Sequence, residues 1–236
     1  MLILFDVDAT LITTGGAGLR ALVLAGQSLY GPDFSDVGVD VAGRLDPLII
    51  SEMLTRAGVR PSPEAIAAVR ESYLARLPHE LRTSNNRALP GVQTLLEALS
   101  SVGSASEARA ILGLLTGNFR ETAHVKLRVC GIDPERFKVA AWGDDSPHEP
   151  PAREHLPPVA VARHAAMTGR QLAARDVLII GDTPHDAACA RAHNHRALGV
   201  ATGRYSIDQL RESGFDHVVP DLSDTQSVLE WILSRR

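Results

Sequence analysis

Short apolar runs that end in polar residues recur along this chain of 236 residues and restrict the folds open to it. Runs of this length are typical of buried strands, and helix-length segments separate most of them. The runs lie at residues 2–5, 111–115, 139–142, 177–180, 197–200 and, more weakly, 217–219. Alternating strands and helices predict an α/β fold in which a Rossmann-like parallel sheet has helices on both faces.

A long interruption separates the first of these runs from the second. Residues 6–110 contain apolar residues at helical spacing, together with two typical helix starts, Asp46-Pro47 and Ser62-Pro63. Turn-rich stretches, TTGGAG at 13–18 and TSNNRALP at 83–90, flank this region. We therefore expect a helical cap over residues 15–88, inserted into an α/β core of residues 1–14 and 89–236. Further helices are expected near residues 91–102 and 222–233.

Polar residues follow the predicted strands at their carboxyl ends, which is where ligands bind in open α/β sheets. They are Asp6, Asp8 and Thr10; Thr116, Gly117 and Asn118; Asp144 and Asp145; and Gly181, Asp182, Thr183 and Asp186. Acids gathered at one edge repel one another unless a cation neutralises them. Because Mg²⁺ is a hard ion that takes oxygen ligands, the pattern predicts a magnesium site.

Three strings carry a resemblance to a known family. FDVDATL at 5–11, LLTGN at 114–118 and GDTPHD at 181–186 occur in this order on successive predicted strands. Their order resembles the haloacid dehalogenase superfamily, and the long insertion looks like the cap of its phosphoglycolate phosphatase-like branch. The resemblance implies a Mg²⁺-dependent phosphatase that hydrolyses a small phosphomonoester, phosphoglycolate-like or a sugar phosphate, through an aspartyl-phosphate intermediate.

The resemblance also implies roles for the acids. Asp6 would be the nucleophile that attacks phosphorus. Asp8, two residues along, would protonate the leaving alkoxide and then accept a proton from water, while its backbone carbonyl faces the metal. Asp182 would complete the metal ligands, and Asp186 would orient metal-bound water or a nearby cation without binding the metal itself.

Phosphate recognition needs donors and a positive charge. The resemblance places Thr116, Gly117 and Asn118 at the phosphate. The lysine usual in the family is absent from the segment after residue 142, and Arg153 is our choice to replace it, because a guanidinium binds phosphate with two donors. Lys126 is the alternative, although its predicted helix lies earlier in the chain.

Three further residues have open interpretations. Arg44, in the string AGRLDPL at 42–48, is a candidate to bind an anionic group of the substrate, but it could equally pair with Asp46 or lie in solvent. The neighbouring acids after residue 142 either close the acidic site or cap the loop that follows; they are Asp144 and Asp145.

The composition limits the classes of partner molecule that we expect for this chain. With 24 Lys+Arg against 28 Asp+Glu the net charge is −4, so no nucleic acid is expected as a partner. No apolar run is long enough for a bilayer, the first residues lack the basic start of a signal peptide, and two cysteines are too few for a disulfide framework. We expect a cytoplasmic enzyme without a membrane partner, acting on a small-molecule phosphate ester. The sequence does not indicate an oligomeric state.

Other functions remain compatible with the motifs. A phosphomutase of the same superfamily would differ mainly in keeping water from the phosphorylated aspartate. A phospho-accepting regulatory or binding module would also hold magnesium beside an aspartate, but receiver-like domains have no helical insertion after the first strand. A scaffold without turnover is the third alternative.

Overall fold

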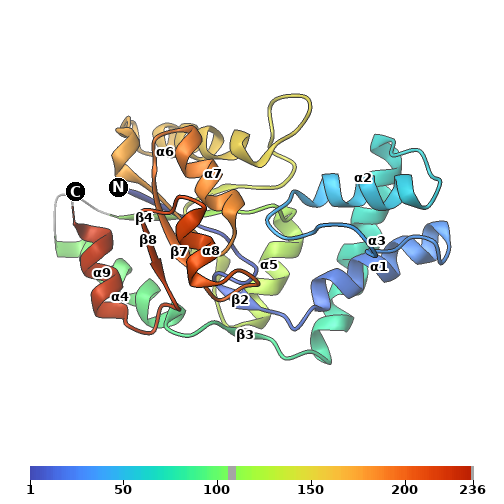
Figure 1. The fold of residues 1–236 in the computed structure, drawn as a ribbon, viewed down its shortest axis with the longest axis horizontal. Helices are drawn as coiled ribbons and strands as arrows, with labels where there is room; N and C mark the ends of the chain where they lie inside the picture. Colours follow the sequence, from blue (N-terminus) through green and yellow to red (C-terminus); the bar gives the residue numbers. More distant parts are fainter. Residues whose placement is uncertain (106–109, 235–236) are drawn as a thin grey trace.

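The computed structural model, which describes residues 1–105 and 110–234, is built on a six-stranded parallel sheet (Figure 1). The strand order is β5-β4-β1-β6-β7-β8, with every neighbouring pair parallel. The strands are β1 (Leu2–Phe5), β4 (Ile111–Leu115), β5 (Val139–Ala141), β6 (Val177–Gly181), β7 (Arg196–Val200) and β8 (His217–Val219). Each predicted run forms a strand, so the predicted α/β class is confirmed.

Strand β1 lies near the middle of the sheet and is buried on both faces. Ile3 and Phe5 belong to one hydrophobic cluster, whereas Leu2 and Leu4 belong to another. This explains why β1 is a continuous apolar run rather than an alternating one. The Asp6 amide donates to Ile180 O at 2.9 Å, which holds Asp6 directly beyond the end of β1.

Helices cover both faces of the sheet. The first cluster is completed by α4 (Val92–Ala105), α5 (Arg120–Val129) and α9 (Thr225–Leu233), and the second by α6 (Leu156–Thr168), α7 (Pro184–Ala192) and α8 (Ile207–Glu212). Three short 3-10 helices, η1 (Pro134–Arg136), η2 (Arg153–His155) and η3 (Ala174–Asp176), lie in the connections. The terminal helix begins three residues later than expected, because Asp224 caps it by accepting from the Ser227 amide at 3.2 Å.

A helical insert, residues 14–86, lies between β2 (Ile12–Thr13) and β3 (Arg87–Ala88), which form a separate two-stranded sheet. These two strands pair antiparallel, so the chain leaves and re-enters the sheet region side by side. The insert contains α1 (Ala17–Tyr30), α2 (Asp46–Arg56) and α3 (Pro63–Arg82), which lie together at one end of the molecule (Figure 1). Whether it behaves as a separate cap with the boundaries 15–88 stays a prediction.

The start of α2 differs by one residue from the sequence prediction. Asp46 is the first residue of the helix rather than its N-cap, and Leu45 takes the capping position with extended backbone. Ser62 does cap α3 as predicted, accepting from the Ala65 amide at 3.2 Å. Among the described residues, no helix has the length and apolar character that crossing a bilayer requires.

The helical insert has a hydrophobic cluster of its own, built around Phe34. The Phe34 side chain is fully buried, and its ring lies against Gly26 of α1 so closely that a Cβ atom at Gly26 would come within 2.2 Å of the ring. Glycine is unfavourable in a helix interior, so its presence here is explained by the close approach of the ring.

We expect Gly26→Ala to lower the free energy of unfolding by about 1–3 kcal/mol, because the ring must move. The gain of up to about 1 kcal/mol in helix propensity opposes this loss. Urea unfolding measures the change. The control is Leu29→Ala on the exposed side of the same helix, expected within about 0.5 kcal/mol of wild type. Stabilisation by Gly26→Ala would contradict the packing argument.

Candidate active site

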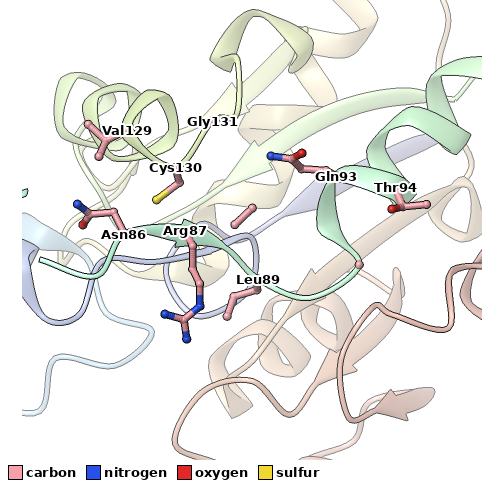
Figure 2. Close-up of a pocket in the computed structure, with 10 residues that line it drawn as sticks. Asn86, Arg87, Leu89, Gln93, Thr94, Val129, Cys130 and Gly131 are labelled. Carbon is pink, nitrogen blue, oxygen red and sulfur yellow. The ribbon is translucent and has the colours of Figure 1, made fainter.

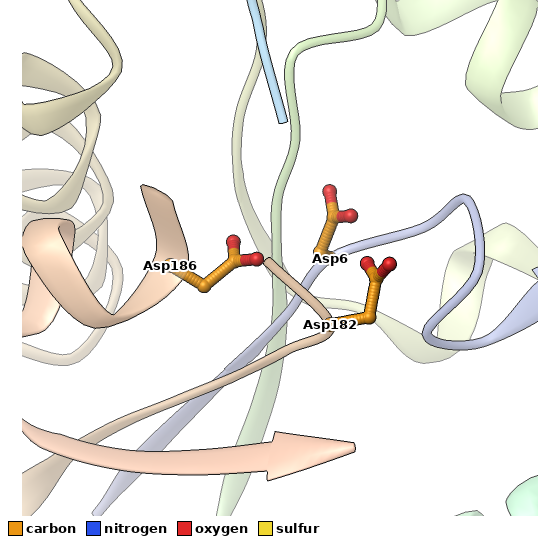
Figure 3. A group of neighbouring side chains, drawn as sticks. All are labelled: Asp6, Asp182 and Asp186. Carbon is orange, nitrogen blue, oxygen red and sulfur yellow. The ribbon is translucent and has the colours of Figure 1, made fainter. Parts of the chain in front are cut away.

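Three carboxylates converge beyond the ends of β1 and β6 (Figure 3). Asp6 follows β1, Asp182 follows β6, and Asp186 lies in the first turn of α7. Each has a carboxylate oxygen within 4.8 Å of the others, and all three side chains are buried. The structure therefore brings together the acids that the sequence predicts at the sheet edge.

The electrostatics of this cluster favour a cation. Burial is the main cause that raises the pKa of Asp6 to about 6, with repulsion from Asp186 adding to it and Arg153 opposing it. Burial followed by repulsion from Asp6 and Asp186 raises the pKa of Asp182 to about 8. Hard oxygen donors crowded in a dry site are suited to a divalent metal ion such as Mg²⁺.

Both carboxylate oxygens of Asp186 accept hydrogen bonds from protein groups. Its Oδ1 accepts from Arg153 Nη2 at 2.7 Å, and its Oδ2 accepts from the Thr183 amide at 3.1 Å and the Thr183 hydroxyl at 2.8 Å. The bond from the Thr183 amide belongs to a capping box at the start of α7. Asp6 and Asp182 are therefore better placed than Asp186 to bind a metal, which agrees with the supporting role expected for Asp186.

Arg153 of η2 is buried and lies against the predicted nucleophile. Its Nη2 is 2.9 Å from Asp6 Oδ1, and its Nη1 donates to Gly43 O in the helical insert at 3.1 Å. Its Nε is buried without a hydrogen-bond partner among the residues that the structure describes. The segment that lacks the usual lysine thus places an arginine beside Asp6.

Lys126 of α5 lies at the same cavity but contacts the other acid. Its Nζ donates to Asp8 Oδ2 at 2.8 Å and to Asn118 Oδ1 at 2.6 Å. Asn118 Nδ2 also donates to Asp8 Oδ2, at 2.8 Å, and to the Thr116 hydroxyl at 2.7 Å. The two cations considered from the sequence therefore divide between Asp6 and Asp8.

The loop after β4 is pressed against the helical insert. Thr116 is fully buried, and its amide donates to Ala141 O at 3.1 Å. A Cβ atom at Gly117 would lie 1.9 Å from Arg44 O, so only glycine allows this approach. Gly117 O accepts from the Asp46 amide at 2.7 Å, which holds the start of α2 on the loop.

Arg44 lines the cavity but does not pair with Asp46. Its guanidinium donates to Glu52 Oε2 at 2.7 Å and to Asp40 O at 2.8 Å. Of the alternatives open from the sequence, the pairing with Asp46 is therefore wrong. Because Arg44 stays partly exposed at the cavity, it remains a candidate for the substrate.

Asp144 and Asp145 lie outside the acidic cluster. Asp144 pairs with Arg70 of α3 at 2.8 Å. Asp145 Oδ2 accepts from the Trp142 amide at 2.8 Å, and its Oδ1 accepts from Arg163 at 2.8 Å. Asp145 therefore caps its own loop, and Asp144 ties the sheet edge to the helical insert.

A cavity of about 360 Å³ lies between the sheet edge and the helical insert. The sheet contributes Asp6 and Asp8 to its wall, and the insert contributes Arg44, Asp46 and Tyr73. Sequence reasoning assigned Asp46 to a helix cap and missed that it faces this cavity. The only signal was its position in the polar string that also contains Arg44.

A larger pocket of about 540 Å³ opens elsewhere, beside β3 and the end of α5 (Figure 2). Its wall includes Arg87, Gln93 and Cys130 but none of the carboxylates of the acidic cluster. Burial raises the pKa of the Cys130 thiol to about 11, so this cysteine is a poor nucleophile. Chemistry rather than volume therefore identifies the smaller cavity as the candidate active site.

Comparisons with known proteins identify the family and support the fold. The profile of the family described as haloacid dehalogenase-like hydrolase matches residues 3–191. The pyrophosphatase PpaX of Anoxybacillus flavithermus is 24% identical over 96% of this chain and 95% of its own. A hydrolase from Pseudomonas syringae has a TM-score of 0.73 at 22% identity, covering 99% of both chains. A predicted phosphoglycolate phosphatase from Haemophilus somnus has a TM-score of 0.63 at 20% identity, covering 97% of both.

The half-buried Asp46 carboxyl at the cavity wall gives a pH-dependent prediction. Burial is the main cause that raises its pKa from 3.8 to about 6, with Lys126 opposing the shift. The ionised carboxylate is therefore unfavourable in the folded state above pH 6, and this cost disappears as the pH falls through 3.8. We expect Asp46→Asn to raise the free energy of unfolding by about 3 kcal/mol at pH 8 and about half as much at pH 5.

Urea unfolding in EDTA at the two pH values measures this difference. Asp33→Asn, at an exposed position, is the control. It should change the free energy of unfolding by less than about 0.5 kcal/mol at both pH values. An Asp46→Asn variant whose effect does not grow from pH 5 to pH 8 would rule out the buried charge as the cause.

Proposed function

Since the chain belongs to the haloacid dehalogenase-like hydrolases, we propose that it is a Mg²⁺-dependent phosphatase acting on a small phosphomonoester. The observation that carries the proposal is the buried Asp6–Asp182 pair with Arg153 at 2.9 Å from Asp6. A nucleophile, an oxygen-ligand site and a phosphate-binding cation thus lie within one cavity. The Anoxybacillus relative is named as a pyrophosphatase, a type of enzyme that also transfers a phosphoryl group to water.

The reaction divides into two displacements. In the first, an Asp6 carboxylate oxygen forms a bond to phosphorus, the ester P–O bond breaks, and the leaving oxygen takes a proton from Asp8. In the second, a water oxygen bonds to phosphorus and gives a proton to Asp8. The bond between phosphorus and Asp6 then breaks, releasing inorganic phosphate and restoring both carboxyl groups.

Mg²⁺ would be held by the carboxylates of Asp6 and Asp182 and by the backbone carbonyl of Asp8. When bound, it supplies positive charge that neutralises the phosphoryl oxygens and the crowded carboxylates. Asp186 keeps Arg153 in place through the 2.7 Å bond, so its role is to orient the guanidinium.

The remaining polar groups bind the phosphoryl oxygens. The Thr116 hydroxyl and the Gly117 amide follow β4, directly beside the end of β1. The Nδ2 group of the neighbouring Asn118 donates to Asp8 and Thr116, so its side chain would hold these groups rather than donate to phosphate. Arg153 adds the charge that the transition state requires. Because these groups are already held in place by the protein, little reorganisation is needed when the substrate binds.

Substrate selection is proposed to reside in the helical insert, acting as a cap over residues 15–88. The cavity of about 360 Å³ suits a small ester, phosphoglycolate-like or a sugar phosphate, and Arg44 is placed to meet an anionic group of it. Closure of the insert would also exclude water from the first displacement. A phosphomutase would use the same groups, so the fate of the phosphoryl group decides between the two.

Removal of the nucleophile gives the first test of this function. We expect wild-type protein to release phosphate from members of a phosphomonoester panel, including phosphoglycolate, with Mg²⁺ and not with EDTA. Asp6→Asn should lose at least about 10³-fold in kcat, since an amide cannot form the aspartyl-phosphate. Circular dichroism should show an unchanged fold.

The results separate the candidate functions. Substantial turnover by Asp6→Asn would refute the nucleophile. Transfer of phosphate between two positions of a sugar, without release, would favour a mutase. Absence of any reaction with the panel would favour a module without turnover.

Arg153 gives a second test. Arg153→Lys keeps the positive charge but loses the paired donors that reach Asp6, Asp186 and Gly43. We expect at least about a 10-fold loss in kcat/KM and weaker inhibition by inorganic phosphate, measured with the best member of the panel. The exposed Arg175→Lys is the matched control. Equal kinetics for Arg153→Lys and wild type would exclude Arg153 from phosphate binding.

A further inference from the structure

The contacts of Lys126 set it apart from the other basic residues. Of the 24 Lys+Arg residues only two are lysines, Lys126 and Lys138. The Lys126 side chain is 6% exposed, whereas the side chain of its partner Asp8 is 42% exposed and faces the cavity. A fully desolvated ammonium next to a cavity-facing carboxylate is costly unless it is fully paired, so its partners indicate its role.

Two of the three N–H donors of the Lys126 ammonium have hydrogen-bond partners, and a hydroxyl group lies near the ammonium. Asp8 Oδ2 and Asn118 Oδ1 accept the two hydrogen bonds at 2.8 and 2.6 Å, and the hydroxyl group is that of Tyr73 in α3. The carboxyl of Asp46 also attracts the ammonium. Because an ammonium has three donors, Lys126 has at most one left for a substrate in this arrangement.

Asp8 is held in a single orientation by these bonds. Its Oδ2 accepts from both Lys126 Nζ and Asn118 Nδ2, each at 2.8 Å. No donor among the described residues bonds its Oδ1, which leaves that oxygen available on the cavity side. The arrangement fixes which carboxylate oxygen can exchange a proton with a reacting group.

The site requires a lysine at this position. A Cβ atom at Gly18 of α1 would lie 2.9 Å from Lys126 Cε and 3.3 Å from the Tyr73 hydroxyl, so the ammonium fits only because residue 18 is glycine. The larger planar guanidinium would not fit in the same space. Two helices of the insert, α1 and α3, thus form the wall that holds Lys126 against Asp8.

We propose that Lys126 is a positioning residue that, together with Tyr73 of the helical insert, orients Asp8 for proton transfer. This inference rests on the proposed function, in which Asp8 exchanges protons with the leaving group and with water. It also links the two parts of the molecule, because Tyr73 of α3 lies beside the ammonium that contacts Asp8. Lys126 acts through Asp8 and does not bind the phosphate.

A double-mutant cycle tests the proposal. The variants are Lys126→Met, Asp8→Asn and the combination, assayed with the best alkyl phosphomonoester of the panel, whose alkoxide must be protonated, and Mg²⁺ at high enzyme concentration, with Asp6→Asn as background. We expect Lys126→Met to lower kcat by about 10- to 100-fold with KM within about 3-fold of wild type. In the Asp8→Asn background the same change should alter kcat by less than about 3-fold, because the group it orients is gone.

Three further variants complete the experiment. Lys138→Met, on an exposed lysine whose Nζ donates to Glu135 O, is the matched control and should leave kcat unchanged. Lys126→Arg should fail to restore activity. Tyr73→Phe, which deletes a single hydroxyl and preserves packing, should lower kcat several-fold in the presence of Asp8 and not in its absence; it keeps the test valid if Lys126→Met does not fold.

The outcomes are distinguishable. If wild type releases phosphate but Lys126→Met lowers kcat equally with and without Asp8, Lys126 acts independently and the proposal is wrong. A rise in KM as the main effect would make Lys126 a substrate ligand, which also overturns it. If wild type releases no phosphate from any substrate, the proposed function itself fails.

Discussion

Burying several carboxylates at one edge of a sheet is the constraint on which the rest of this structure depends. Strands β1 and β6 end beside each other, so Asp6 and Asp182 are brought together by the register of the sheet rather than by local preference. Charges of like sign in a dry site must be neutralised or protonated. Arg153 neutralises part of this charge, and burial together with the remaining repulsion raises the pKa values of Asp6 and Asp182.

The crowding of carboxylates at this edge also explains the position of a second cation, Lys126. Asp8 follows Asp6 by two residues and cannot share Arg153, whose donors are directed at Asp6, Asp186 and Gly43. Lys126 reaches it from α5 instead. The site thus contains two ion pairs. The Arg153–Asp6 pair is buried at the predicted metal site, whereas the Lys126–Asp8 pair borders the cavity and contacts the helical insert.

Much of this could be predicted from the sequence. The sheet strands were visible because burial on both faces makes them continuous apolar runs, and the acids at their ends were visible because parallel strands end at the same edge. The approximate place of the insert followed from its turn-rich flanks. Arg153 was identified as a replacement for the missing lysine, and it does lie against Asp6.

What the sequence could not indicate were contacts between distant segments. Asp46 resembles a helix cap, and its burial in the cavity depends on α2 lying on the loop at Gly117. Arg44, which precedes α2, pairs with Glu52 in the second turn of that helix, and Asp144 pairs with Arg70 of α3. The antiparallel β2–β3 pair brings both ends of the insert together. An insert of different length or shape could therefore replace this one during evolution without changing the register of the six-stranded sheet. Specificity can then diverge while the catalytic residues are inherited unchanged.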